Sequence, residues 1–167
     1  TYTPIFTDIG SVIRVWVSYT DGFGTLEALV SAETETIINV NDPGVASIDN
    51  TTPSQGDILT ASASDFDGLT TSTFSYQWRR DGIDISGATA ASYTTIQADV
   101  TTAISVAVSY TDDQGGVENP ISAPTSSVTN INDTPVGTVV IVGTASEGQV
   151  LTADTSGISD EDGVGAF

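Results

Sequence analysis

Ile104-Ser-Val-Ala-Val-Ser-Tyr-Thr-Asp112 is the stretch of sequence that decides the fold, because it has an earlier copy, Ile13-Arg-Val-Trp-Val-Ser-Tyr-Thr-Asp21. In both copies Ile, Val, Val and Tyr stand at every second position, and the residues between them are polar or small except Trp16. This is the pattern of a half-buried β-strand. The copying extends well beyond this strand. Four more pairs are separated by the same 91 positions: Tyr2 and Tyr93, Asp8 and Asp99, Glu27 and Glu118, and Asn39 and Asn130. Repetition at this spacing predicts a tandem array of small β-domains.

The 167 residues accommodate one whole repeat and parts of two others. We assign residues 1–41 to the last part of one repeat, 42–132 to a complete repeat, and 133–167 to the first part of the next, in which Phe167 aligns with Phe74. An incomplete sandwich exposes an apolar face and unpaired strand edges. We therefore expect the two partial repeats to be cuts in a longer array, or to be completed by a neighbouring chain.

The strand candidates follow one another at the spacing expected of a Greek-key β-sandwich, and no segment shows a sustained period of 3.6 residues. The predicted fold class is therefore all-β, with tandem sandwich repeats of about 91 residues. In the complete repeat we predict strands at 45–48, 58–64, 74–80, 83–85, 93–95 and 104–112, and a last strand that ends near residue 131. In the flanking parts we predict strands at 2–4, 12–19, a returning strand to about 40, 139–142 and 150–153.

The composition limits the partners of the chain. With 3 Lys and Arg against 22 Asp and Glu, the net charge is −19. This charge argues against binding to nucleic-acid phosphates and to an anionic membrane surface. It suits cation binding and solubility outside a cell. There is no Cys, so disulfides and thiolate-bound metals are excluded, and no apolar run is long enough to insert into a membrane.

A family resemblance rests on four features of the complete repeat. They are Trp78 in the third strand, the stretch Asp81-Gly-Ile-Asp-Ile-Ser-Gly-Ala-Thr89, Tyr93, and Asp99-Val-Thr-Thr-Ala-Ile-Ser-Val106. These features resemble the immunoglobulin-like (Ig-like) repeats of giant bacterial surface adhesins of the RTX type, and the resemblance covers essentially the whole chain. It implies an Ig-like fold, a secreted or cell-surface location and a part in cell adhesion. Because the disulfide of antibody domains is absent, we expect Trp78 to pack against aliphatic residues such as Val106 and Val108.

The connectors between repeats, Asn39-Val-Asn-Asp42 and Asn130-Ile-Asn-Asp133, are similar to the calcium-binding linkers of cadherin-type modules. Ca²⁺ takes six to eight oxygen ligands, so one connector supplies only part of a site. In a Greek-key sandwich the acidic loops gather at the two ends, and this predicts Ca²⁺ at each junction. For the first junction the candidate ligands are Asn39, Asn41, Asp42, Asp65, Asp67, Asp112 and Asp113. For the second they are Gln55, Asp57, Asp99, Asn130, Asn132, Asp133, Asp160 and Asp162.

Each of these motifs also has a purely structural interpretation. Asp-x-Asp-Gly is a common turn sequence, and Asn-Asp-Pro is an ordinary linker. Asp99 and its copy Asp8 can act as turn carboxylates near an arginine, and Asp112 and Asp21 can simply shape a hairpin. The gathering of several acidic turns at the same end of the sandwich favours calcium over these alternatives.

The sequence favours a structural spacer or stalk, whose partners are the neighbouring repeats of the same chain. The alternative is a binding module that recognises a glycan, a surface or an identical chain in a self-assembling fibre. Against the fibre stands the absence of a counterpart of residues 75–92 after Phe167. Trp16, Trp78 and Tyr110 are expected in a core or an interface and not as sugar platforms. An enzyme is not expected, because His, Cys and Lys are all absent and the acids recur in each repeat.

Overall fold

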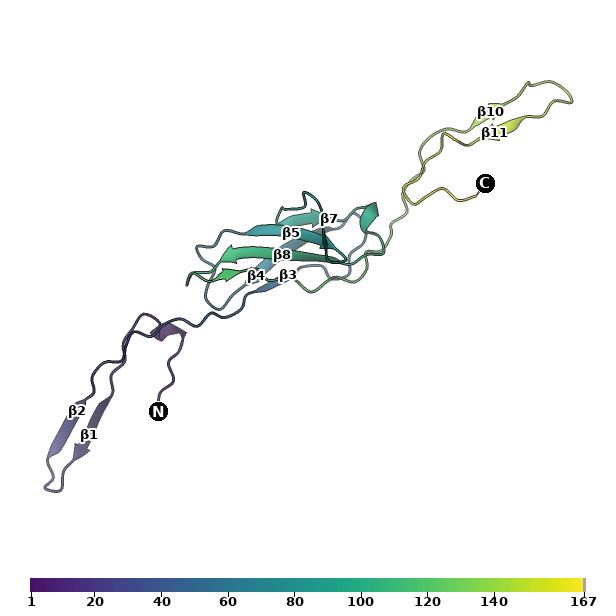
Figure 1. The fold of residues 1–167 in the computed structure, drawn as a ribbon. Helices are drawn as coiled ribbons and strands as arrows, with labels where there is room; N and C mark the ends of the chain where they lie inside the picture. The colour runs from purple at the N-terminus through teal and green to yellow at the C-terminus, as the bar shows by residue number, and fades with distance from the viewer. Residues whose placement is uncertain (167) are drawn as a thin grey trace. The chain divides into compact units, whose positions relative to one another are not determined.

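The computed structural model describes residues 1–166, so the predicted match between Phe167 and Phe74 lies outside the described residues. The described residues form antiparallel β-strands and two short 3-10 helices, without an α-helix (Figure 1). This architecture confirms the predicted all-β class. The chain divides into two compact units, Thr1–Asp42 and Pro43–Phe167, and each is described by itself.

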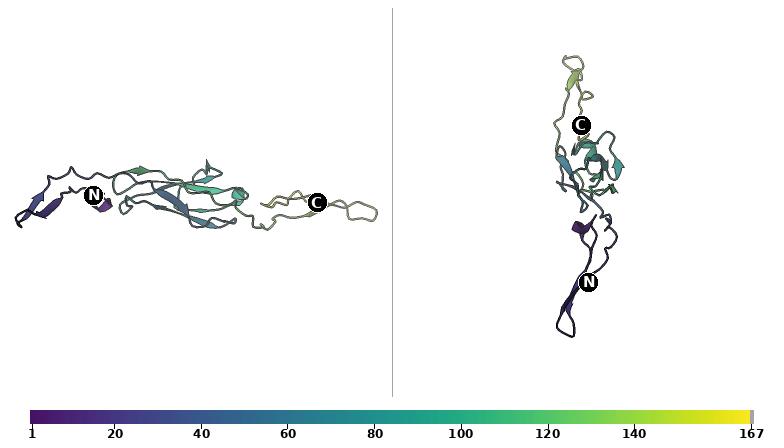
Figure 2. Two further views of the ribbon diagram at one scale, coloured as in Figure 1. Left: turned by 90° about the horizontal axis from the view of Figure 1, so that it is seen from below. Right: turned by 90° about the vertical axis from the view of Figure 1, so that its left-hand side faces the viewer.

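The second unit contains a β-sandwich of two antiparallel sheets (Figure 2). One sheet has the order β3-β4-β7, with bounds Val45–Ile48, Ile58–Ser64 and Ser92–Thr94. The other has the order β6-β5-β8-β9, with bounds Ile83–Asp84, Ser75–Arg80, Ile104–Thr111 and Val117–Glu118. The 3-10 helix η2, Gln97–Asp99, precedes β8. The repeated stretch that begins at Ile104 therefore forms β8, an inner strand of the second sheet.

The core lies between these two sheets. Every second residue of β8 points inward, and Ile104, Val106, Val108 and Tyr110 are all buried. They pack in one cluster with Ala46 and Ile48 of β3, Leu59 and Ala61 of β4, and Trp78 of β5. Trp78 pairs with Val106 across the sheet, and its indole Nε1 donates to the carbonyl of Ala90 at 2.9 Å. The expected packing of Trp78 against aliphatic residues is confirmed.

The strands β3 and β4 have their predicted bounds, but the last strand is much shorter than predicted. Only Val117–Glu118 continues the ladder regularly, and Pro120 follows two residues later. Beyond it, the hydroxyl oxygens of Ser122 and Thr125 accept the backbone N–H groups of Val106 and Ile104, each at 3.0 Å. Side-chain oxygens thus take the place of backbone carbonyls. The segment still lies along β8, although its backbone is too irregular to form a strand.

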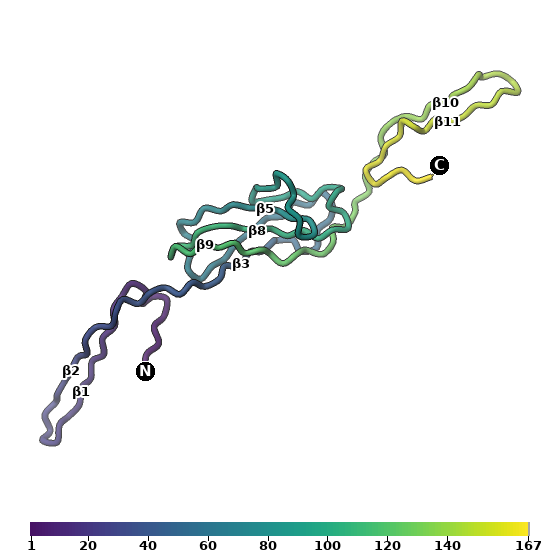
Figure 3. The backbone as a smooth tube through the Cα atoms, in the orientation of Figure 1, coloured from purple at the N-terminus to yellow at the C-terminus, as the bar shows by residue number. Residues whose placement is uncertain are grey.

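The first unit is a hairpin (Figure 3). It repeats the hydroxyl-to-backbone bonds found beside β8. It contains η1 (Phe6–Asp8), β1 (Trp16–Thr20) and β2 (Leu26–Val30), and β1 pairs with β2. Both strands are shorter than predicted, and the predicted strand at 2–4 is absent. Ser31 and Thr34 accept the N–H groups of Val15 and Ile13, each at 3.0 Å. These are the bonds of Ser122 and Thr125, found 91 positions earlier.

Residues 133–166 carry a second hairpin, which belongs to the second unit. Its strands are β10 (Val140–Val142) and β11 (Thr152–Asp154), close to the predicted ranges. Ile141 pairs with Ala153 as Ile48 pairs with Ala61 in the sandwich. Residues 133–166 therefore repeat the pairing of β3 with β4. Within the described residues, no helix has the length and apolar character needed to cross a membrane.

Candidate metal centre

Three carboxylates meet in the second unit. Asp65 lies in the loop after β4, Asp112 follows β8, and Glu118 ends β9. One oxygen atom from each of them lies within 4.8 Å of the other two. Carboxylate oxygens are the ligands that a hard cation such as Ca²⁺ prefers. We call Asp65, Asp112 and Glu118 the acidic cluster.

Asp112 is the most buried member of the acidic cluster, with 4% of its surface exposed. The hairpin fixes its side chain, because Oδ1 accepts the backbone N–H groups of Gln114 at 2.8 Å and Gly116 at 2.9 Å. Its other oxygen, Oδ2, is buried and receives no hydrogen bond from the described residues. Burying a carboxylate oxygen without a donor is costly, and a bound cation removes that cost. The donor set and this orphaned oxygen therefore fit a metal ion.

Asp65 is held in place by two hydrogen bonds. Its Oδ1 accepts the backbone N–H of Asp67 at 2.9 Å, which closes the loop after β4. Its Oδ2 accepts the hydroxyl of Tyr110 at 2.8 Å. The pKa of Tyr110 is raised well above the ordinary value, first by burial, then by this bond and by the charges of Asp65, Glu118 and Asp112. The tyrosine therefore stays protonated and donates to the acidic cluster.

Glu118 is the one member of the acidic cluster that was not predicted as a ligand from the sequence. It accepts the backbone N–H of Gly44 at 3.3 Å, at the start of the sandwich. Two signals point to it: Glu27 and Glu118 are 91 positions apart, and Glu118 pairs across the strands with Tyr110 as Glu27 pairs with Tyr19. Once the strand register is known, Glu118 can be recognised as a candidate ligand, because it lies opposite the tyrosine that donates to Asp65.

Gly44 shows how closely the chain passes the acidic cluster. A Cβ atom at this position would overlap the hydroxyl of Tyr110 and lie 2.9 Å from Oδ2 of Asp65. Only glycine allows this approach while Tyr110 keeps its bond to Asp65.

The other two predicted ligands from these loops are Asp67 and Asp113. Asp67 is buried, with 1% of its surface exposed. Asp113 uses both oxygens elsewhere: Oδ2 accepts N–H and Oγ1–H of Thr70 at 2.9 and 2.7 Å, and Oδ1 accepts those of Thr71 at the same distances. These four bonds hold the pKa of Asp113 well below its usual range, and the two from Thr70 have the larger effect. Asp113 thus ties the loop after β4 to the β8–β9 hairpin, and its oxygens already have donors.

The connector ligands predicted for the first junction lie at the end of the first unit. Asn39, Asn41 and Asp42 belong to Thr1–Asp42, so their approach to the acidic cluster stays a prediction. Both connectors have the same local bond, since Asn41 and Asn132 each donate from Nδ2 to the carbonyl of the next aspartate, at 3.5 and 2.8 Å.

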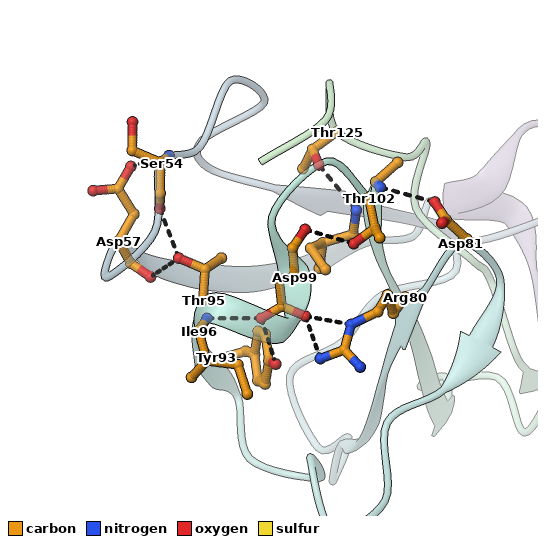
Figure 4. Close-up of polar contacts among 12 residues, drawn as sticks. Ser54, Asp57, Arg80, Asp81, Tyr93, Thr95, Ile96, Asp99, Thr102 and Thr125 are labelled. Carbon is orange, nitrogen blue, oxygen red and sulfur yellow. Dashed lines mark hydrogen bonds and ion pairs between the residues drawn. The ribbon is translucent and has the colours of Figure 1, made fainter. Parts of the chain in front are cut away.

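Asp99, a predicted ligand of the second junction, is held by an ion pair and hydrogen bonds inside the sandwich (Figure 4). It is completely buried, and its Oδ1 forms an ion pair with Arg80, at 2.7 Å from Nε and 2.6 Å from Nη2. Its Oδ2 accepts the hydroxyl of Tyr93 and the N–H of Ile96, both at 2.8 Å. Burial and the bond to Asp99 raise the pKa of Tyr93 to about 12. A metal ion would have to displace Arg80, so the turn-carboxylate interpretation fits Asp99 better than a ligand role.

Asp57 is likewise engaged in a turn. Its Oδ2 accepts the N–H of Ser54 at 2.9 Å and Nδ2 of Asn50 at 3.2 Å, and its backbone carbonyl accepts the N–H of Thr95 at 2.9 Å. The turn that carries Gln55 is thereby fixed to the strand β7 and its extension.

The remaining residues of the second junction form a chain of hydrogen bonds. Gln55 donates from Nε2 to Oδ2 of Asp133 at 2.8 Å, and the N–H of Asp133 donates to Oδ2 of Asp162 at 2.8 Å. The N–H of Asp162 donates to Oδ1 of Asp160 at 2.9 Å, which repeats the bond between Asp67 and Asp65. Asn130 is exposed. The structure therefore brings Gln55, Asp133, Asp160 and Asp162 together, and leaves Asp57 and Asp99 in separate networks.

Comparison of the chain with models of protein families, with curated proteins and with solved structures found no match in any of the three.

Proposed function

We propose that the chain is part of an extracellular bacterial spacer or stalk, in which Ca²⁺ bound at the acidic cluster stiffens the joint between repeats. The observation that carries the proposal is the orphaned Oδ2 of Asp112, buried beside Asp65 and Glu118. The proposed role is mechanical and not catalytic, because the acids return at the same position in each repeat.

The mechanism follows from charge. Without a cation, the acidic cluster holds three like charges within 4.8 Å, and their repulsion loosens the loop after β4 and the β8–β9 hairpin. A bound Ca²⁺ replaces this repulsion with three attractions and links two loops that are distant in sequence. The cluster fills only part of the ion's shell of six to eight oxygens. Asn39, Asn41 and Asp42 of the connector are proposed to supply further oxygens, so that binding also fixes the joint.

Isothermal titration of residues 1–167 with CaCl₂ tests the binding step. We expect heat of binding from the unaltered chain and none from Asp112→Asn, which keeps the shape of the side chain but removes its charge. Asp49→Asn is the matched control, because the carboxylate of Asp49 also accepts two backbone N–H groups, from Thr60 and Asn50, but lies outside the cluster. Equal heats from the two variants would contradict the proposal.

Stiffening is tested separately by fluorescence energy transfer. The chain has no cysteine, so Thr36→Cys and Thr89→Cys allow one dye to be placed on each compact unit. We expect a broad distribution of inter-dye distances in chelator and a narrower one in Ca²⁺. A distribution that Ca²⁺ does not narrow, in a chain shown by titration to bind it, would mean that the metal stabilises the sandwich without setting the joint.

A further inference from the structure

Two segments near the start and the end of the complete repeat lie side by side and run in the same direction. Residues 51–55 follow β3, and residues 126–129 come at the end of the irregular segment beside β8. The pairing of Ser54 with Thr129 is parallel, whereas the strands β1 to β11 pair antiparallel. We call residues 51–55 and 126–129 the parallel clamp.

Three backbone hydrogen bonds join the two halves of the parallel clamp. The N–H of Ser126 donates to the carbonyl of Thr51 at 2.8 Å, and the N–H of Thr129 donates to the carbonyl of Pro53 at 3.0 Å. The N–H of Gln55 donates in return to the carbonyl of Thr129 at 2.9 Å. These bonds connect the part of the chain that enters the sandwich directly with the part that leaves it.

Residues 51–55 are also fixed to the body of the sandwich. Pro53 is fully buried, and because proline has no N–H, it takes part in the parallel clamp only as an acceptor. The N–H of Ser54 donates to Oδ2 of Asp57 at 2.9 Å, and the carbonyl of Ser54 accepts the hydroxyl of Thr95 at 2.7 Å (Figure 4). This segment therefore cannot shift along the sandwich without breaking these bonds as well.

Residues 126–129 are fixed in a similar way. Val128 is 2% exposed and belongs to the core cluster. Its N–H donates to the carbonyl of Thr102, and its carbonyl accepts the N–H of Thr101, both at 2.9 Å. The hydroxyls of Ser54 and Thr129 share a further hydrogen bond of 2.8 Å. The two halves of the parallel clamp are thus held in a single register.

The parallel direction decides how a pull on the two connectors acts on these bonds. Residues 51–55 are pulled backward, through β3, from the first connector, and residues 126–129 are pulled forward from the second. Because the two segments are parallel, these pulls slide one segment along the other, across the direction of the hydrogen bonds. The three backbone bonds then carry the load together, and all of them must break before the segments separate.

We propose that the parallel clamp is the load-bearing element of this sandwich, which keeps the repeat folded when the chain is pulled at its two connectors. While the parallel clamp holds, the pull passes from one half to the other and does not reach the inner strands β4, β5 and β8. Resistance to forced unfolding depends on the unfolding barrier, so a few bonds that break together can set it. The load-bearing role rests on the proposed stalk function, but the resistance itself needs no bound Ca²⁺.

Optical tweezers that pull residues 1–167 by handles at the two ends test the proposal. Opening of the sandwich is recognised by a gain in length of roughly 300 Å, the extended length of residues 44–130. We expect Ser126→Pro to lower the mean unfolding force by about a third, because it removes one of the three loaded backbone bonds. Ser127→Pro is the matched control, since Ser127 is the next residue, is also exposed, and its N–H takes no part in the parallel clamp.

The direction of pulling gives a second measurement that leaves the backbone of the parallel clamp unaltered. The chain has no cysteine, so Gln55→Cys with Asn130→Cys allows handles to be placed at the same end of both segments. A pull between them opens the three bonds one after another, so we expect opening at about a third of the end-to-end force. This measurement decides the question if Ser126→Pro does not fold.

Equal unfolding forces for Ser126→Pro and Ser127→Pro would overturn the proposal, and so would equal forces in the two pulling directions. All of these measurements are made in chelator, so they do not depend on whether the acidic cluster binds Ca²⁺. Calcium titration of Ser126→Pro should in turn give the heat of the unaltered chain, because Ser126 lies outside the acidic cluster. Failure of the load-bearing role and failure of the calcium proposal are therefore distinguishable.

Discussion

At the scale of single residues, Gly44 is the position with the least freedom around the acidic cluster. A methyl group there would overlap the Tyr110 hydroxyl and crowd Oδ2 of Asp65. We expect Gly44→Ala to lower the free energy of unfolding by about 1–3 kcal/mol, the usual cost of overpacking, and to weaken Ca²⁺ binding. Urea unfolding and calcium titration measure the two effects. Gly22→Ala is the control, because its added methyl meets no atom within 4 Å, and an equal loss in both variants would contradict this argument.

Asp113 gives the sandwich a dependence on pH whose sign can be worked out. Four hydrogen bonds from Thr70 and Thr71 lower its pKa in the folded state. Its contribution to stability is therefore complete above the pKa of an unfolded aspartate, about 3.9. It is lost as the pH falls through the lower pKa of the folded state.

Thermal melting of Asp113→Asn and the unaltered chain checks this sign. We expect the variant to melt at a lower temperature at pH 7, and the difference to shrink as the pH falls from about 4 to about 2. A difference that stays constant over this range would show that the charge of Asp113 is not what ties the two loops.

The sequence predicted Asp65 and Asp112 as neighbours because both fall in loops at the same end of a Greek-key sandwich. It could not separate oxygens that are free to bind a cation from those that already have donors. Asp99 lies in an acidic turn, as the other predicted ligands do, but its oxygens already accept hydrogen bonds from Arg80, Tyr93 and Ile96. Glu118 was missed for the converse reason, since its role depends on strand register.

At the scale of elements, the strands from β3 to β8 lie within one residue of their predicted bounds, whereas β1 and the last strand of the complete repeat do not, although β1 has the same alternation as β8. β3 and β4 pair backbone to backbone and were predicted to the residue. The segment after β9 contains Pro120 and satisfies β8 through hydroxyl groups, so its irregular backbone cannot be inferred from apolar periodicity alone.

These hydroxyl bonds provide an internal comparison of buried and exposed copies. Ser122 and Thr125 accept buried N–H groups, and Ser31 and Thr34 make the same bonds where the chain is exposed. We expect Ser122→Ala or Thr125→Ala to cost about 1–3 kcal/mol of unfolding free energy, because a buried donor loses its partner. Ser31→Ala and Thr34→Ala should cost about 0.5 kcal/mol or less. Urea unfolding is followed by Trp78 fluorescence in a Trp16→Phe background for the two sandwich variants, and by Trp16 fluorescence in a Trp78→Phe background for the two hairpin variants. Equal costs at buried and exposed positions would contradict the role of burial.

At the scale of the whole molecule, the net charge of −19 affects the proposed binding of Ca²⁺. Internal repetition was visible from the sequence because it needs only the spacing of letters. The difference in burial between Val17, which is exposed, and its counterpart Val108, which is buried, could not be predicted from the sequence. The two residues have the same local sequence and differ only in what covers them. Burial is a property of the assembled repeat, and a strand that lacks its covering sheet has the same local sequence as one that has it.

The same charge makes it necessary to separate specific calcium binding from general screening. Raising NaCl from about 0.01 to about 0.15 M shortens the Debye length from about 30 to about 8 Å. We expect this to raise the melting temperature of the unaltered chain and of Asp112→Asn alike, because both carry a large excess of like charge.

In the higher salt, Ca²⁺ at about 1 mM, a concentration at which extracellular calcium modules bind the ion, should raise only the melting temperature of the unaltered chain. Mg²⁺ at the same concentration should act less, since it demands a tighter octahedral shell than carboxylates from two loops provide. If Asp112→Asn gained the same shift from Ca²⁺, the ion would be acting as one more screening cation, and the acidic cluster would owe its geometry to the loops alone.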